Sequence, residues 1–137
     1  MIYEVDFDEN RLFVREKGKK YAVELPEKLL DFTVDIIKFV QRLPHNREYD
    51  VFRYQLPKAA ASVGANYEES QAGSYAEFKH RIQVCLRESR ESFYWLRVIE
   101  RLKVQDDEEY LVELQRLLGE TGEIKLIFGA ISAKTNK

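Results

Sequence analysis

The sequence predicts an all-α protein: an antiparallel, up-and-down four-helix bundle preceded by a short N-terminal β-hairpin. Four segments carry apolar residues at spacings of three and four, the pattern of amphipathic helices. Short polar connections separate these segments, which favours antiparallel neighbours. The chain has 137 residues, enough for one domain with its own core. We divide it into an N-terminal extension, 1–24, and a bundle, 25–137, with helices at about 26–43, 47–71, 74–103 and 106–132.

The extension differs from the rest of the chain because its apolar residues alternate with polar ones. Tyr3, Val5 and Phe7 alternate with acidic residues, and two further apolar runs flank the turn-like segment 17–20, which contains Gly18. Period-two alternation around a glycine is typical of a β-hairpin. An isolated hairpin is marginally stable in water, so we expect it to pack on the bundle or on another subunit.

Proline and asparagine mark the limits of the first two helices. Pro26 suits a first helical position, Pro44 ends the first helix, and Asn46 is an N-cap for the second. Pro57 lies inside the second helix, where it should kink the helix or divide it into two. The same helix is rich in small residues, which favour close helix packing: Ala59, Ala60, Ala61, Ser62, Gly64 and Ala65.

The third helix, 74–103, is the core helix around which the bundle is organised. Ser74 and Glu77 form a capping box at its start. Its apolar stripe repeats at spacings of four and three: Phe78, Ile82, Cys85, Ser89, Ser92, Leu96 and Ile99. In the fourth helix, Asp106 and Glu109 make a second capping box. Gly119 and Gly122 each weaken that helix by roughly 1 kcal/mol relative to alanine, so a break there is an alternative.

Composition excludes several classes of protein. The net charge of −2 gives no global attraction to nucleic acid or anionic membranes, so such binding needs a local patch. The single cysteine cannot form an intrachain disulfide, and its place on the apolar stripe indicates a buried residue. We expect no signal peptide, and no apolar run approaches the ~20 residues of a membrane span. The expected location is the cytoplasm.

Two segments together resemble a known family. The first is Gln55-Leu56-x-x-Ala59-Ala60-x-Ser62-Val63-Gly64-Ala65-Asn66-Tyr67-x-Glu69. The second is Phe78-x-x-x-Ile82 followed by Arg87-Glu88-Ser89-Arg90-Glu91-Ser92-x-Tyr94-Trp95-Leu96. Their order and spacing resemble the bacterial four-helix bundle proteins encoded in intervening sequences of 23S rRNA genes. The accessory proteins of diversity-generating retroelements are related in fold. The resemblance covers roughly residues 26–133.

The resemblance implies a four-helix bundle that assembles into a homopentamer, with no known enzymatic activity and no cofactor. It also implies a link to RNA or DNA, or to a nucleic-acid-processing protein, because the retroelement members bind nucleic acid and a reverse transcriptase through a basic surface. The sequence departs from the family pattern in residues 1–24, which look like an addition, and at Pro57, where an ordinary helix former is more usual.

One polar face of the third helix forms what we call the basic strip. Its members recur at spacings of three and four, and none is acidic: Lys79, Gln83, Arg87, Arg90, Tyr94, Arg97 and Arg101. Arginine forks with an interleaved tyrosine suit phosphates and a stacked base. The nucleic-acid-binding candidates are therefore Lys79, Arg87, Arg90, Tyr94, Arg97 and Arg101. The alternative is a solvated face neutralised by neighbours, such as Arg87 with Glu91 and Arg97 with Glu100.

The other polar face of this helix carries carboxylates beside Trp95, Val84 and Val98, and this mixture indicates a subunit contact. Part of it belongs to the family-like motif, together with two residues of the second helix. Our assembly candidates are Asn66, Glu69, Glu88, Glu91 and Trp95. We expect them to join a hydrogen-bond network between helices or subunits that sets register and has no catalytic role.

Signs of catalysis or metal binding are missing from the sequence. Glu77 and His80 have the Glu-x-x-His form of di-iron bundles, but such sites need two copies and further glutamates. We find no glycine-rich phosphate loop, zinc spacing or nucleophile elbow. We therefore expect no catalytic residue, no metal and no enzyme. The first hypothesis is a homo-oligomeric scaffold that binds RNA or DNA through the basic strip. The alternative is a protein-interaction module that never touches nucleic acid, with the hairpin as its docking edge.

Overall fold

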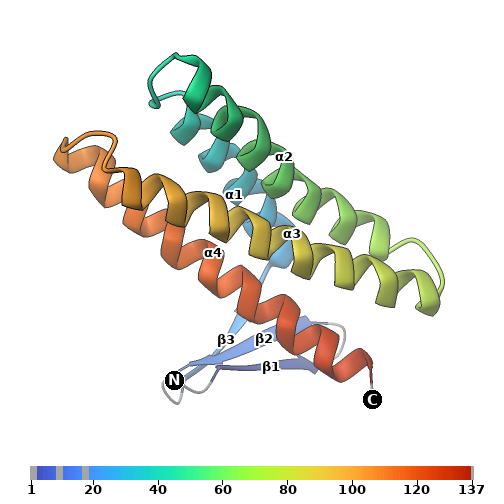
Figure 1. Ribbon diagram of the computed structural model, residues 1–137. Coiled ribbons are helices and arrows are strands. Elements are labelled where there is room, and N and C mark those ends of the chain that lie inside the picture. Colours follow the sequence, from blue (N-terminus) through green and yellow to red (C-terminus); the bar gives the residue numbers. More distant parts are fainter. Residues whose placement is uncertain (1–2, 9–10, 17–18, 137) are drawn as a thin grey trace.

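A computed structural model shows four helices packed around one apolar core (Figure 1). It describes the backbone of residues 3–8, 11–16 and 19–136 and the side chains of residues 24–136. The helices are α1 (Leu25–Val40), α2 (Arg47–Ser70), α3 (Tyr75–Leu102) and α4 (Glu108–Thr135). Consecutive helices run in opposite directions (Figure 1). The prediction of an all-α protein with four helices is confirmed.

Three short strands precede the helices: β1 (Tyr3–Asp8), β2 (Arg11–Glu16) and β3 (Lys19–Val23). They pair antiparallel in the order β1-β2-β3, and β1 runs beside α4. The hairpin predicted for residues 1–24 is not confirmed: a third strand joins the pairing, and residues 17 and 18 of the expected turn lie outside the described residues.

The helix ends follow local capping rules, with one correction. The side chains of Asn46 and Ser74 accept hydrogen bonds from the backbone N–H groups of Tyr49 and Glu77. At the start of α4 the cap is Asp107, whose carboxylate accepts from the Tyr110 N–H at 3.0 Å. The predicted cap, Asp106, was therefore one residue too early. The chain contains two adjacent aspartates there, and only the path of the α3–α4 turn selects between them.

The two helix breaks considered from sequence, at Pro57 and at Gly119 and Gly122, do not occur. Helix α2 continues through Pro57, and α4 continues through Gly119 and Gly122 to Thr135. Burial explains why α4 persists, because Leu117, Leu118 and Thr121 lie against the core beside the glycines. Apolar burial of this extent outweighs about 1 kcal/mol per glycine. The first helix ends at Val40, three residues before the predicted end, although Leu43 is still buried.

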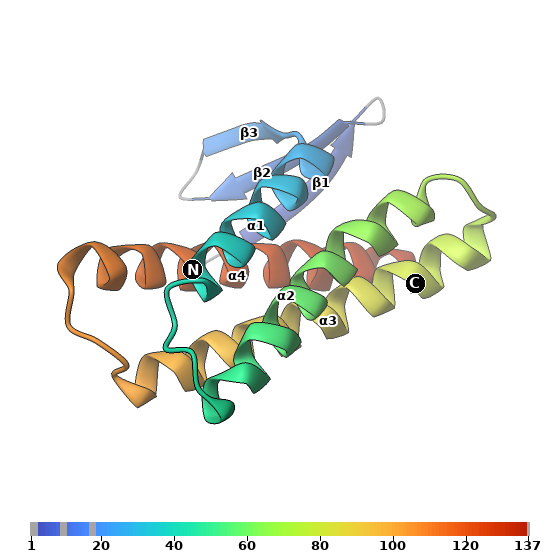
Figure 2. The same cartoon turned by 90° about the horizontal axis from the view of Figure 1, so that it is seen from above.

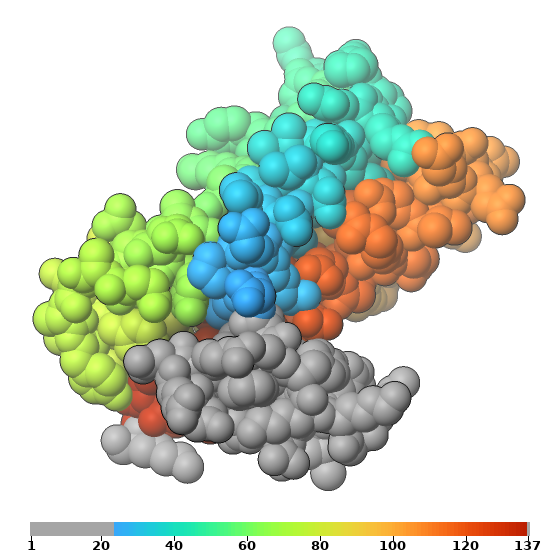
Figure 3. All heavy atoms as spheres, turned by 180° about the vertical axis from the view of Figure 1, so that it is seen from behind, coloured from blue at the N-terminus to red at the C-terminus, as the bar shows by residue number. Residues whose placement is uncertain are grey.

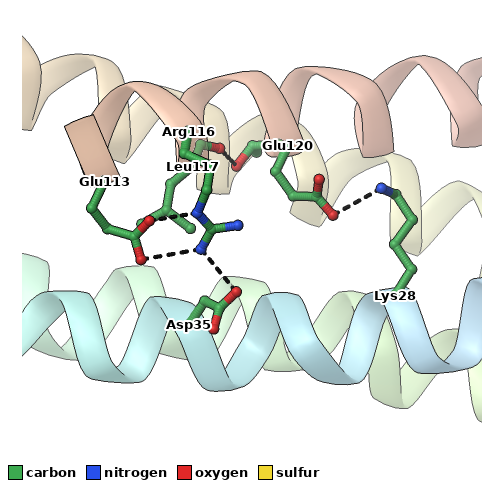
Figure 4. Close-up of polar contacts among 7 residues, drawn as sticks. Lys28, Asp35, Glu113, Arg116, Leu117 and Glu120 are labelled. Atoms are coloured by element: carbon green, nitrogen blue, oxygen red, sulfur yellow. Dashed lines mark hydrogen bonds and ion pairs between the residues drawn. The ribbon is translucent and has the colours of Figure 1, made fainter.

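Each helix packs most closely on its neighbour in sequence, and α1 meets α4 to complete the bundle (Figure 2). The stacked rings of Phe39 and Tyr110, 5.2 Å between centroids, join α1 to α4 near one end. Farther along, charged residues of the two helices also meet (Figure 4). Lys28 lies 2.8 Å from both Glu120 and Glu123, and Arg116 of α4 lies 2.9 Å from Asp35 of α1.

Candidate nucleic-acid interface

The basic strip lies on α3 because helix geometry separates it from the buried stripe. The fully buried residues of α3 include Ile82, Ser89 and Leu96. The strip residues are offset from these positions around the helix, so that Arg87, Arg90, Tyr94, Arg97 and Arg101 are all exposed. Lys79 is half-buried. The structure therefore leaves five of the six predicted nucleic-acid contacts open to solvent.

Gln83 differs from its neighbours in the strip. Its side-chain amide donates a hydrogen bond to the hydroxyl of Ser132 on α4. This contact fastens α3 to α4 and turns Gln83 toward the bundle. The continuous line of polar residues read from the sequence is thus divided, with Lys79 on one side of Gln83 and the four arginines on the other.

The arginines are only weakly neutralised by neighbouring carboxylates. Within residues 24–136, no ion pair joins Arg87 to Glu91, although the two are four residues apart on one helix. Arg97 does approach Glu100, at 3.5 Å between Nε and Oε1. Arg90 and Arg101 make no ion pair in the same part of the chain. Most of the guanidinium groups are free to meet an external anion.

A shallow basin of about 460 Å³ lies on this face of α3. Its walls combine three cations with two aromatic rings and a valine: Arg90, Phe93, Tyr94, Arg97, Val98 and Arg101. Positive charge beside aromatic surface is the combination used to hold phosphates and bases.

Lys125 of α4 adds a cation that the sequence analysis missed. Its ammonium lies 4.2 Å from the centroid of the Phe93 ring, and Arg97 lies 5.9 Å from the same ring. Both are cation–π distances. Spacing within α3 could not reveal Lys125, because the residue belongs to another helix and meets the basin only through the packing of α4 on α3.

The residues proposed for assembly divide into two groups. Asn66 and Trp95 lie within the α2–α3 contact: Arg81 donates to Asn66 Oδ1 at 2.9 Å, and the Trp95 ring meets Phe52 edge-on at 5.8 Å. Glu69 and Glu91 are exposed. The indole Nε1 of Trp95 is buried without a hydrogen-bond partner in the described part of the protein. Trp95 thus serves the fold of one chain, whereas the assembly role of the group stays a prediction.

Glu88 lies next to Glu91, and the surroundings of Glu88 disfavour the ionised form of its carboxyl group. Burial, the charge of Glu91 and a hydrogen bond between the two side chains raise the pKa of Glu88, while Arg87 and Lys58 oppose this shift. A carboxyl group that binds its proton more tightly than usual can donate a hydrogen bond to its neighbour. The pKa of Glu88 is therefore higher than that of an isolated surface glutamate.

The potential nucleophiles of α3 are engaged in packing. Cys85 is fully buried, its thiol donates to the carbonyl of Val63, and burial raises the thiol pKa to about 12. Ser89 and Ser92 donate to backbone carbonyls one turn earlier.

Across the described residues there is no cluster of three or more His, Cys, Asp or Glu side chains placed to hold a metal ion. None of the helices in this described part is both long enough and apolar enough to cross a membrane.

Comparison with known protein families gives a match that includes the two motifs of α2 and α3. A family model described as 23S rRNA-intervening sequence protein matches residues 23–125. The chain belongs to this family. A crystal structure of a protein with unknown function from the S23 ribosomal protein family of Bacteroides thetaiotaomicron is 27% identical, with a TM-score of 0.67, over 79% of this chain and 97% of that one. No curated protein matches the chain.

Membership in the 23S rRNA-intervening sequence family confirms the resemblance drawn from the paired motifs. The matched region begins at the end of β3 and covers α1, α2, α3 and most of α4. The basic strip and the basin both lie inside it, whereas β1 and β2 lie outside. That residues 1–24 are an addition to the family's bundle stays a prediction.

Proposed function

We propose that this protein is a non-enzymatic, homo-oligomeric scaffold that binds RNA or DNA through the basic strip. The observation that carries the proposal is the row of exposed arginines on α3, of which Arg90 and Arg101 make no ion pair within residues 24–136. Arg87 and Arg101 are separated by fourteen residues, or ~21 Å along the helix axis. That length spans several phosphates of a nucleic-acid strand.

Charge is distributed unevenly over the bundle, which supports this use of α3. Helix α3 carries six Lys or Arg against four Glu, whereas α4 carries three against five. The acidic surplus of α4 is directed to the α1 seam, where Lys28 pairs with Glu120 (Figure 4) and also with Glu123. The side of α4 near the basin contributes Lys125 instead. A protein with a net charge of −2 can therefore present a local positive surface.

The oligomeric part of the proposal is supported by apolar residues on the outer face of α1. Leu30, Val34 and Ile37 follow one another at spacings of four and three, and each is more than 40% exposed. In Figure 3, α1 forms part of the surface between α2 and α4. A line of exposed aliphatic side chains on a helix fits a contact with another chain. Assembly into a ring, a homopentamer by family resemblance, would present several basic strips on one particle.

The deciding experiment is a titration of fluorescent structured RNA and duplex DNA at low and moderate salt. The wild type is compared with an Arg87→Ala/Arg90→Ala/Arg97→Ala/Arg101→Ala variant, with the oligomer mass of both measured by light scattering. We expect salt-sensitive binding by the wild type, because each phosphate contact releases counterions. The variant should lose binding and retain its mass.

A charge-matched control separates the strip from general electrostatics. The Lys38→Ala/Arg47→Ala variant removes two exposed cations of α1 and α2, and Arg90→Ala/Arg101→Ala removes two from the basin. Both variants have the same net charge. Equal loss of affinity in the two would refute the strip as the contact surface. Absence of binding by the wild type at low salt would refute nucleic-acid binding altogether and favour the protein-interaction module.

A further inference from the structure

The basin on α3 contains an exposed aromatic ring that is contacted at its side by a second aromatic residue. Tyr94 is 60% exposed and lines the basin. Its ring meets Trp95 edge-on, with 5.4 Å between centroids, and Trp95 in turn meets Phe52 of α2 at 5.8 Å. The rings of Tyr94, Trp95 and Phe52 thus form a chain of contacts from the surface to the α2–α3 interface. The position of Tyr94 is therefore restrained, although much of its ring is bare.

The second aromatic ring of the basin, that of Phe93, is already in contact with cations. Lys125 and Arg97 both lie over Phe93, at 4.2 and 5.9 Å from its centroid. In the described part of the protein, no cation lies over Tyr94. The two neighbouring aromatics thus have different surroundings: Phe93 has two cations over its ring, while Tyr94 is 60% exposed to solvent.

The cations surround Tyr94 at helical spacings. Arg90 precedes it by four residues, and Arg97 and Arg101 follow it by three and seven, so all lie on the same side of α3. A flat ligand that stacks on Tyr94 would have guanidinium groups on both sides along the helix axis. A nucleotide within a strand has this form, since its base is flanked by phosphates in both directions.

We propose that the basin binds an unpaired nucleotide, whose base stacks on Tyr94 while the flanking phosphates pair with Arg90, Arg97 and Arg101. The inference rests on the proposed function and makes it more specific. A base in a continuous duplex is stacked on its neighbours and cannot lie on a side chain without being extruded. The protein therefore prefers single-stranded or looped nucleic acid to an uninterrupted duplex.

The test compares a single-stranded oligonucleotide, a hairpin with an open loop and a blunt duplex, each containing the fluorescent base 2-aminopurine at one position. The variants are Tyr94→Ala, Tyr94→Phe, Tyr54→Ala and Arg90→Ala/Arg101→Ala. Tyr54 is a matched control, because it is 62% exposed on α2 and lies beside one cation, Lys58, outside the basin. Melting temperatures and oligomer masses establish that every variant is folded.

We expect Tyr94→Ala to weaken binding of the single strand roughly 5- to 150-fold, the usual effect of removing one stacking aromatic. The salt dependence should not change, because no phosphate contact is lost, whereas Arg90→Ala/Arg101→Ala should reduce the salt slope by about two. Tyr94→Phe keeps the ring and should bind like the wild type. Stacking on Tyr94 should also quench 2-aminopurine in the wild type and less in Tyr94→Ala.

Three results would overturn the inference. Binding of the blunt duplex as tight as that of the single strand would do so, as would Tyr94→Ala with unchanged affinity, or equal losses in Tyr94→Ala and Tyr54→Ala. In each case salt-sensitive binding that depends on the arginines would still support the proposed function. No binding to any probe at low salt would overturn both.

Discussion

Replacing Lys28 with methionine should loosen the seam between α1 and α4. The Lys28 ammonium lies 2.8 Å from a carboxylate oxygen of both Glu120 and Glu123, and the three side chains are 17%, 25% and 30% exposed. Burial lowers the pKa of Lys28, but the hydrogen bonds to both glutamates outweigh it, and the net pKa is raised. Methionine keeps the aliphatic stem and leaves two carboxylates without their shared cation.

The expected loss follows from the partial burial of the cluster. Exposed ion pairs contribute about 0–1 kcal/mol, and removal of one partner from a buried pair costs about 3–5 kcal/mol. The Lys28 cluster lies between these limits, so we expect about 2 kcal/mol. For a domain of this size that corresponds to a fall of roughly 8 °C in Tm. The pKa of Lys28 is raised above its ordinary value of 10.5. The contribution of Lys28 to folding stability is therefore complete below pH 10.5 and is lost as the pH rises through the raised pKa.

The assay is urea denaturation at fixed protein concentration, in low salt and in 1 M NaCl, with Lys38→Met as the matched control on the exposed side of α1. The control should stay within about 0.5 kcal/mol of the wild type. Adding Glu120→Gln and Glu123→Gln to Lys28→Met should recover much of the loss, because the repulsion disappears. The reasoning fails if Lys28→Met costs no more than the control or if the glutamine pair restores nothing.

Three further predictions concern α2 and α3. Glu88→Gln should stabilise the protein at pH 7 by less than about 1 kcal/mol, because the raised pKa of Glu88 means that ionisation destabilises the folded state. The gain should vanish in acid, below the ordinary pKa of 4.5, and a Tm that is unchanged or lower at pH 7 would contradict it. Cys85, with a pKa of about 12, should resist iodoacetamide at pH 8 until urea unfolds the chain, whereas rapid alkylation of the native protein would show an open thiol. Asn46→Ala should cost about 1 kcal/mol in urea denaturation, because it removes the cap on the Tyr49 N–H, and a cost below a few tenths would mean that water replaces the cap.

Much of the helical architecture was predictable because it depends on neighbours in sequence. The stripe from Ile82 to Ile99 repeats with the helical period, and Asn46 and Ser74 each cap a backbone N–H three residues away. Such features need no knowledge of the rest of the fold. The exposure of the arginines follows in the same way, since residues offset from a buried stripe on a helix must face outward.

The partners of charged and aromatic side chains were not predictable in this way. Arg87 and Glu91 have the spacing of a helical ion pair and do not form one, whereas Lys28 pairs with Glu120, 92 residues away. The spacing permits the first pair, but two exposed side chains gain little from it. The second pair exists because α1 and α4 meet at a particular rotation that encloses the lysine.

The sequence by itself determined that this protein is a bundle of four helices and that α3 carries a row of arginines. Both are consequences of a repeat of three and four residues along one chain. Only the tertiary structure decided that Lys125 of α4 lies over Phe93, and that Trp95, which contacts Tyr94, also meets Phe52 of α2. The physical reason is that these contacts depend on how α2 and α4 pack against α3, and on which face of each helix the core leaves outside.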